Sequence, residues 1–312
     1  MPGYVLRRLW QSVPTLLGVV LLVFFLFNWV GGDPAYLLAG KITNPEQIEN
    51  IRRQLGVDQP YAAQLQIFAV QIARGDFGSS WATNEKVSEI LATRLGPSLT
   101  VLLPLLAIST LLAVAGAMLS AYIRGSLGDR AIMIACTLGQ SISILVYIIV
   151  AQYVLAYQLG WFPVQGWGNT LGENLFRYGL LPVMVGVIVS LAPDIRLYRG
   201  FFVEEINQDY VRTARAKGLS ETRVMWVHVL RNAAIPIVTN VMIQLPGLLV
   251  GAFLIERFFS IPGIGREVIL AVERSDFPVL KAVTIYVALA TMIVNLLADL
   301  LYKAIDPRLE LK

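Results

Sequence analysis

The chain has 312 residues, of which 56% are hydrophobic and only 15% are charged, and its mean hydropathy is +0.65. Soluble globular chains carry about 25% charged residues, so this composition excludes an ordinary soluble protein and indicates a membrane protein. The net charge of +4 is too small and too dispersed for a nucleic-acid-binding surface. Because the chain has one cysteine and one histidine, it excludes a disulfide framework and predicts no metal site of its own.

Apolar segments of about 20 residues, long enough to cross the bilayer core, occur six times along the chain. They are Pro14–Val30, Pro97–Tyr122, Ile132–Tyr157, Leu180–Tyr198, Pro236–Ile255 and Val279–Tyr302. The first segment resembles a signal peptide because Arg7 and Arg8 precede it, but no small-residue cleavage site follows it. We therefore expect an all-α, polytopic membrane protein of about six transmembrane helices, with an uncleaved first span.

The basic residues predict the orientation of these spans. The two tails and the even-numbered connections hold 14 of the 25 lysines and arginines. The other side holds 11, but six of these lie in the long segment 31–96, and loops of that length cross largely regardless of their charge. Both termini are therefore expected in the cytoplasm.

The chain is expected to divide into an N-terminal tail and first span (1–30), an extracytoplasmic segment (31–96) and a core transmembrane domain (97–312). The extracytoplasmic segment shows helical patterns at 45–55, 61–72 and 85–95, separated by turn-rich stretches. It is either a small lid over the bundle or a docking surface for an external partner. The residues expected to face such a partner are Asp33, Asp58 and Asp76.

The inner segment 199–235 is too polar to span a membrane and too regularly patterned for an unstructured loop. It allows helix at 201–206, 210–217 and 221–230. Ala214 and Gly218 are four residues apart, so they share one face of a short helix, where small side chains would let another surface approach the backbone. The alternative is that the basic residues around them, Arg212, Arg215 and Lys217, only set the topology.

Polar residues within the spans also fall on helix faces. Such faces pack helices together or line a watery path. Several of them in one chain favour a shared polar passage, and its candidate residues are Gln140, Ser141, Asn240, Gln244, Thr291 and Asn295.

Motifs for catalysis are absent from the sequence. It has no Gly-x4-Gly-Lys-Ser/Thr loop for holding ATP, no His-Glu-x-x-His and no Gly-x-Ser-x-Gly. The alternative function is a proton-coupled secondary transporter using Asp194 or Asp299, but no acid–base relay at the bilayer centre and no internal repeat supports it.

A set of short motifs along nearly the whole chain resembles the permease subunits of ABC importers of the peptide/nickel family, most closely the dipeptide and oligopeptide permeases. The inner segment carries Asp-Tyr-Val-Arg-Thr-Ala-Arg-Ala-Lys-Gly-Leu at 209–219, followed by His228 and Pro236. The other motifs lie at 7–9, 32–34, 55–60, 75–80, 255–266, 276–278 and 306–308.

This resemblance implies the type I (MetI-like) ABC importer permease fold, with an N-in/C-in topology, in a bacterial inner membrane. It also implies that a coupling helix seats in a groove of the ATPase subunit. The residues carried over to that helix are Ala214, Arg215, Ala216, Lys217, Gly218 and Leu219. The sequence departs from the general ABC permease pattern because Arg-Thr-Ala replaces Glu-Ala-Ala at 212–214, which fits the peptide-type branch.

The partners that the resemblance implies are a second homologous permease in a heterodimer, two ATPase subunits, an extracytoplasmic substrate-binding protein and membrane lipid. ATP and Mg would be bound by the ATPase subunits, so the chain itself would hold no cofactor and would not be an enzyme. Its expected role is to form, with the second permease, a translocation path for dipeptides or oligopeptides.

Overall fold

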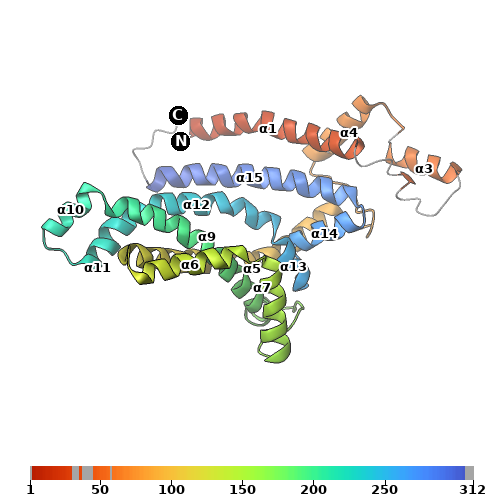
Figure 1. Ribbon diagram of the computed structural model, residues 1–312. Helices are drawn as coiled ribbons and strands as arrows, with labels where there is room; N and C mark the ends of the chain where they lie inside the picture. The colour runs from red at the N-terminus through yellow and green to blue at the C-terminus, as the bar shows by residue number, and fades with distance from the viewer. Residues whose placement is uncertain (1, 30–34, 37–44, 57, 306–312) are drawn as a thin grey trace. The chain divides into compact units, whose positions relative to one another are not determined.

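The computed structural model describes residues 2–29, 35–36, 45–56 and 58–305. Within these residues the regular elements are all helical, apart from an isolated bridge between Ser79 and Lys86. The predicted all-α fold is thus confirmed. The helices shown in Figure 1 are α1 (Pro2–Trp29), α3 (Pro45–Leu55), α4 (Tyr61–Ala73), α5 (Val87–Tyr122), α6 (Leu127–Ser141), α7 (Ile144–Ala151), η1 (Gln152–Gln158), α8 (Leu171–Glu173), η2 (Asn174–Tyr178), α9 (Leu180–Ile206), α10 (Asp209–Ala216), α11 (Glu221–Arg223), η3 (Val224–Val229), α12 (Leu230–Val250), α13 (Phe253–Phe258), α14 (Ile264–Glu273) and α15 (Phe277–Ile305).

Contacts divide the chain into two compact units. Unit 1 comprises residues 1–96 and 263–312, and unit 2 comprises residues 97–262. Helix α5 begins in unit 1 and continues into unit 2. This division by contacts joins the C-terminal segment to the N-terminal one, whereas the sequence-based description kept residues 97–312 together.

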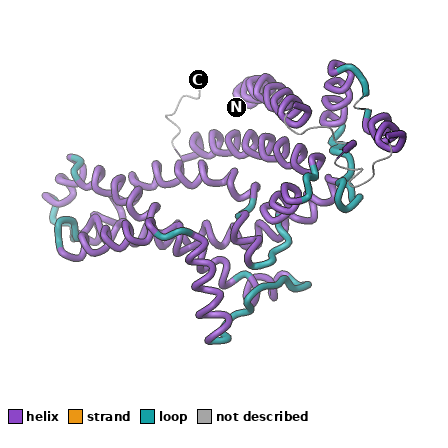
Figure 2. The backbone as a smooth tube through the Cα atoms, turned by 45° about the vertical axis from the view of Figure 1, so that its right-hand side comes forward, coloured by secondary structure: helices purple, strands orange, loops and turns teal. Residues whose placement is uncertain are grey.

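Unit 1 is built on the pair α1 and α15, which lie alongside each other (Figures 1 and 2). Its core joins the start of α5, helix α14 and the start of α15 through Val87, Ile90, Ile264 and Val279, among others. An ion pair between Arg94 Nε and Glu267 Oε2, at 3.2 Å, links α5 to α14.

A buried carboxylate fixes the chain that enters α15. Asp276 is 3% exposed and accepts hydrogen bonds from the Ser80 hydroxyl, from the Trp81 N–H at 3.1 Å and from the Ala82 N–H at 3.3 Å. Because a buried charge needs such partners, Asp276 holds the turn at residues 80–82 against the N-terminus of α15.

Unit 2 has α9 at its centre, with α6 and α12 packed against it. One core cluster joins α5, α9, α10, η3 and α12 around Tyr198 and Phe202, both fully buried. A second cluster joins α7, η1, α9 and α13 around Ile148, Leu181 and Phe259. The first cluster carries the inner segment, so α10 and α11 extend from a packed base (Figure 1).

Five helices are long and apolar enough to cross a membrane, and a sixth span arises if one bent pair is counted as a single crossing. The five are Trp10–Trp29, Val87–Tyr122, Leu180–Ile206, Glu221–Leu248 and Phe277–Leu297. The prediction of about six spans is therefore confirmed, whereas two of the predicted boundaries are wrong.

The third predicted span, Ile132–Tyr157, is not one continuous helix. It falls on α6 and on α7 with η1, which are bent by 90° at residues 142–143. The Ser143 hydroxyl accepts a hydrogen bond from the Leu145 N–H and so caps α7, while the Ser141 hydroxyl bonds back to the Thr137 carbonyl. Serine hydroxyls compete for backbone hydrogen bonds in this way, which favours a break that the apolar count does not detect.

The fifth predicted span, Pro236–Ile255, starts too late and ends too late. Helical backbone already begins at Glu221 and continues through η3 and α12 to Val250. It ends there because Gly251 has φ +86°, outside the helical region, and the separate helix α13 follows.

The outer segment was predicted to hold three helices. The first two are confirmed as α3 and α4. The third, at 85–95, is not separate, because α5 runs without interruption from Val87 into the second span.

Candidate functional site

The inner segment forms a hairpin of α10 and α11, joined by the turn at residues 217–220 (Figure 1). Helix α10 ends in a Schellman motif: the Gly218 N–H donates to the Arg215 carbonyl at 2.9 Å, and the Leu219 N–H donates to the Ala214 carbonyl at 3.4 Å. Gly218 has φ +78°, and a Cβ at this position would meet nothing within 4 Å. The glycine is therefore required by the left-handed turn and not by crowding within the chain.

The hairpin has a buried face and an exposed face. Val211 and Ala214 are 0% and 5% exposed and pack with Phe202 and Val224, and Leu219 packs against the same cluster. The sequence placed Ala214 and Leu219 among the partner contacts. In the structure Ala214 packs on its own unit and Leu219 is half-buried, so their contact with a partner stays a prediction. The exposed positions of the predicted set are Arg215, Ala216, Lys217 and Gly218, and Arg212 lies exposed beside them.

Ion pairs partly neutralise the exposed face. Arg215 makes a two-bond pair with Glu221 across the turn, with Nε–Oε1 at 2.7 Å and Nη2–Oε2 at 3.2 Å. Arg212 Nη1 lies 3.4 Å from Asp209 Oδ1 within α10. The Arg215–Glu221 pair bridges the two arms of the hairpin, which favours one conformation of the turn.

A tyrosine fixes the base of the hairpin. The Tyr210 hydroxyl donates to Glu205 Oε2 at 2.5 Å, which ties α10 to the end of α9. Burial, together with the nearby Glu205 carboxylate, raises the pKa of Tyr210 to about 12, although a hydrogen bond with Asn232 opposes the shift. The neutral, donating form of this hydroxyl is therefore the one that holds the base together.

A buried ion pair that sequence reasoning missed lies where α5, α6 and α9 meet. Arg199 donates to Asp129 through Nε at 2.8 Å and through Nη2 at 2.7 Å. The same carboxylate accepts from the Ser120 hydroxyl at 2.6 Å and from the Gly125 N–H at 3.0 Å. The two charges are 70 residues apart in the chain, so no local spacing identifies them as partners.

The predicted path residues of unit 2 bond to neighbouring groups. Asn240 Nδ2 donates to the Tyr198 hydroxyl at 3.1 Å and Gln244 Nε2 to Asp194 Oδ1 at 3.5 Å, so both join α12 to α9. Gln140 accepts from Arg196 at 3.0 Å.

In unit 1 the Thr291 hydroxyl donates to the Val287 carbonyl of its own helix, and Asn295 is exposed. The predicted path residues thus belong to two units, four to unit 2 and two to unit 1. A single passage lined by all of them remains a prediction.

Of the three aspartates predicted to face an external partner, two lie in the described part of the chain. Asp33 lies outside the described residues. Asp58 is exposed, and so is Asp76, whose Oδ1 accepts from the Gly78 N–H at 3.0 Å. Asp76 also lines a cavity of unit 1. Within the described part of the chain, no group of three or more His, Cys, Asp or Glu side chains is placed to hold a metal ion.

The chain matches a known transport family in both its N-terminal part and its remainder. Residues 112–311 match the family described as "binding-protein-dependent transport system inner membrane component", and residues 1–103 match its N-terminal counterpart. The glutathione transport system permease protein GsiC of Escherichia coli (strain K12) is 35% identical over 312 residues, 100% of both chains. GsiC of Salmonella typhimurium shows the same identity and coverage. The probable peptide ABC transporter permease protein y4tP of Sinorhizobium fredii is 33% identical over 309 residues, 98% of both chains.

The two family matches together cover nearly the whole chain, and they rule against a proton-coupled secondary transporter. The family implies an ATPase and a binding protein as partners, so ATP hydrolysis takes place outside this subunit. The chain therefore belongs to the inner-membrane components of binding-protein-dependent transport systems, as a non-enzymatic permease subunit of an ABC importer.

Proposed function

We propose that this permease translocates short peptides, and that it does so as one half of a heterodimer with a second, homologous permease. The peptide assignment is supported by relatives that span the full chain, one named for glutathione, which is itself a small peptide, and one for peptides. An extracytoplasmic binding protein delivers the peptide, and two ATPase subunits on the cytoplasmic side hold ATP and Mg.

The hairpin of α10 and α11 is the element through which the ATPase subunits move this chain. The observation that carries this proposal is the division of the hairpin into a face packed on its own unit and a face left exposed. A packed base transmits displacement because close-packed cores deform little. The ATPase can shift the permease only if it contacts the hairpin differently in the two states of the transport cycle.

A steric block on the exposed face tests this coupling. Ala216 is exposed at the end of α10, so Ala216→Trp adds bulk without burying a mismatched group in the core. We expect the variant to insert into the membrane and to have the same melting temperature as the wild type. It should no longer co-purify with the ATPase subunits, and substrate should no longer stimulate ATP hydrolysis in proteoliposomes.

The matched control is Arg124→Trp, an exposed position in the turn between α5 and α6 of the same unit. This variant should keep full transport. Normal peptide uptake by Ala216→Trp in the complete assembly would refute the coupling role of the hairpin.

The substrate class is tested separately with the reconstituted importer and its cognate binding protein. We expect unlabelled dipeptides, tripeptides or glutathione to compete with labelled peptide for ATP-dependent uptake, while a nickel chelate does not. Competition by the chelate alone would overturn the peptide assignment and would leave the ABC importer assignment intact.

A further inference from the structure

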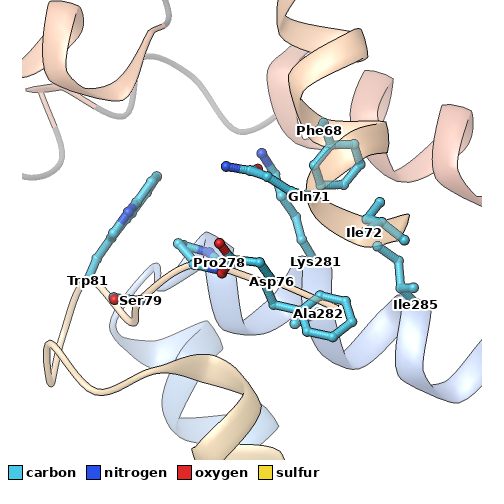
Figure 3. Close-up of a pocket in the computed structure, with 12 residues that line it drawn as sticks. Phe68, Gln71, Ile72, Asp76, Ser79, Trp81, Pro278, Lys281, Ala282 and Ile285 are labelled. Carbon is cyan, nitrogen blue, oxygen red and sulfur yellow. The ribbon is translucent and has the colours of Figure 1, made fainter. Parts of the chain in front are cut away.

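A cavity in unit 1 lies where the outer segment meets the start of α15. Its volume is about 290 Å³, at the small end of the range of ligand pockets. Figure 3 shows Phe68, Ile72 and Ile285 on one side of it and Ser79 and Trp81 on the other. Helix α4, the turn after it and the first turns of α15 therefore all contribute to its wall.

Lys281 is the cationic group of this cavity. Its Nζ lies 5.6 Å from the ring centre of Phe68 and 5.9 Å from that of Phe27. None of the ion pairs found among the described residues involves Lys281. Two aromatic faces stabilise an ammonium but do not neutralise it, so an anion from outside the chain would complete this site.

Asp76 supplies an opposite charge in the same cavity. One of its carboxylate oxygens accepts from the Gly78 N–H, and it forms no ion pair with Lys281. The cavity thus holds a cation and an anion apart from each other. Such a pair complements a ligand that carries both charges, because a purely anionic ligand would be repelled by the carboxylate.

The apolar side of the cavity continues into a membrane span. Lys281 and Ile285 belong to the candidate span Phe277–Leu297, and Ile285 is fully buried. Trp81 packs against Phe277 at 5.7 Å between ring centres, an aromatic pair at the end of the span. Aromatic side chains gather at this level of a membrane, where lipid headgroups meet acyl chains.

We propose that this cavity binds one zwitterionic aminophospholipid of the phosphatidylethanolamine class. Lys281 binds the lipid phosphate, Asp76 binds the headgroup ammonium, and an acyl chain follows Phe68 and Ile72, which are half-buried, towards the bilayer. A lysine at the membrane surface attracts lipid phosphates electrostatically. A short peptide carries the same two charges, but it lacks the long apolar tail that would cover the apolar wall of the cavity.

The test measures lipid retention by the assembled importer, purified in mild detergent and supplied with equal amounts of phosphatidylethanolamine and phosphatidylglycerol that have the same acyl chains. Native mass spectrometry counts the lipids that remain bound. We expect the wild type to retain one phosphatidylethanolamine per copy of this chain. Lys281→Met should lower the occupancy of this site about fivefold for both lipids. The Asp76→Asn variant should still bind a lipid phosphate, but it should lose its preference for a headgroup with an ammonium. The ratio of the two retained lipids should therefore shift towards phosphatidylglycerol.

The control is Lys86→Met, which removes an exposed lysine of the same outer segment and should retain lipid as the wild type does. Equal retention by wild type and Lys281→Met would overturn the proposal, as would an unchanged lipid ratio in Asp76→Asn. Lys281-dependent binding of a soluble dipeptide, with no lipid retained, would also overturn it and would assign the cavity to peptides.

Discussion

Asp129 receives four hydrogen bonds from three residues at the end of unit 2 from which the hairpin extends. The side chains of Asp129 and Arg199 are 7% and 23% exposed, so both charges are largely withdrawn from water. Such a pair fixes geometry more than it adds stability, because desolvation offsets much of the attraction. Here it joins the turn after α5 and the start of α6 to α9, the helix on which α10 is seated.

Breaking this pair should destabilise unit 2 strongly. Asp129→Asn leaves Arg199 charged and without its carboxylate, which typically costs about 3–5 kcal/mol. We expect a melting temperature several degrees below that of the wild type, measured by thermal unfolding in detergent. The control is Arg212→Ala, which removes an exposed charge of 74% side-chain exposure and should change stability by about 1 kcal/mol or less. If Asp129→Asn has the same melting temperature as the control, the ion pair does not hold α6 and α9 together.

The hairpin of α10 and α11 carries the exposed basic face, and it also contains the residues that attach it to the rest of unit 2. Gly218 sets its turn, the Arg215–Glu221 pair bridges its arms, and Tyr210 bonds its base to α9. The three features act at different points of a short segment, so the hairpin keeps one shape although it is exposed. A fixed shape is what a docking element needs, since ordering a flexible loop on binding costs conformational entropy.

The Tyr210 hydroxyl predicts a pH dependence of this attachment. Its pKa rises from 10.0 to about 12 in the folded chain, so the bond stabilises the fold fully below pH 10 and is lost between pH 10 and pH 12. Tyr210→Phe lacks the bond at every pH. The melting temperature of the wild type should therefore exceed that of Tyr210→Phe by a constant margin up to pH 9, and the margin should shrink as the pH rises to 12. A margin that stays constant over the whole range would show that the hydroxyl does not titrate as described.

The family and the membrane location of the chain are shown, whereas its orientation in the membrane remains a prediction from the basic residues. It places the hairpin in the cytoplasm and the segment 31–96 outside. Single cysteines at Lys217 and Ser79, both exposed, distinguish the two sides. The natural Cys136 is buried and should contribute little background.

A membrane-impermeant thiol reagent added to intact spheroplasts should label Ser79→Cys and not Lys217→Cys. Inside-out vesicles should give the reverse pattern. Labelling of Lys217→Cys from outside would place the hairpin on the external face and would remove the basis for ATPase docking there.

Properties that depend on composition and on local pattern could be predicted from the order of the residues alone. Apolar length determined the number of spans, and the Asn-Gln-Asp and Gly-Leu-Ser breaks at 207–209 and 218–220 determined the limits of α10. The ordered set of short motifs along the chain indicated the family. These signals can be recognised in the linear sequence because helix propensity, capping and hydropathy act over a few neighbouring residues.

Which face of each helix packs inward could not be predicted from the order of the residues. Packing in the folded chain buried Ala214, paired Asp129 with Arg199, bonded Asn240 and Gln244 to α9, and divided the third span at residues 142–143. Packing partners and buried charge pairs form between residues far apart in the chain, so their energies depend on contacts that no local pattern contains.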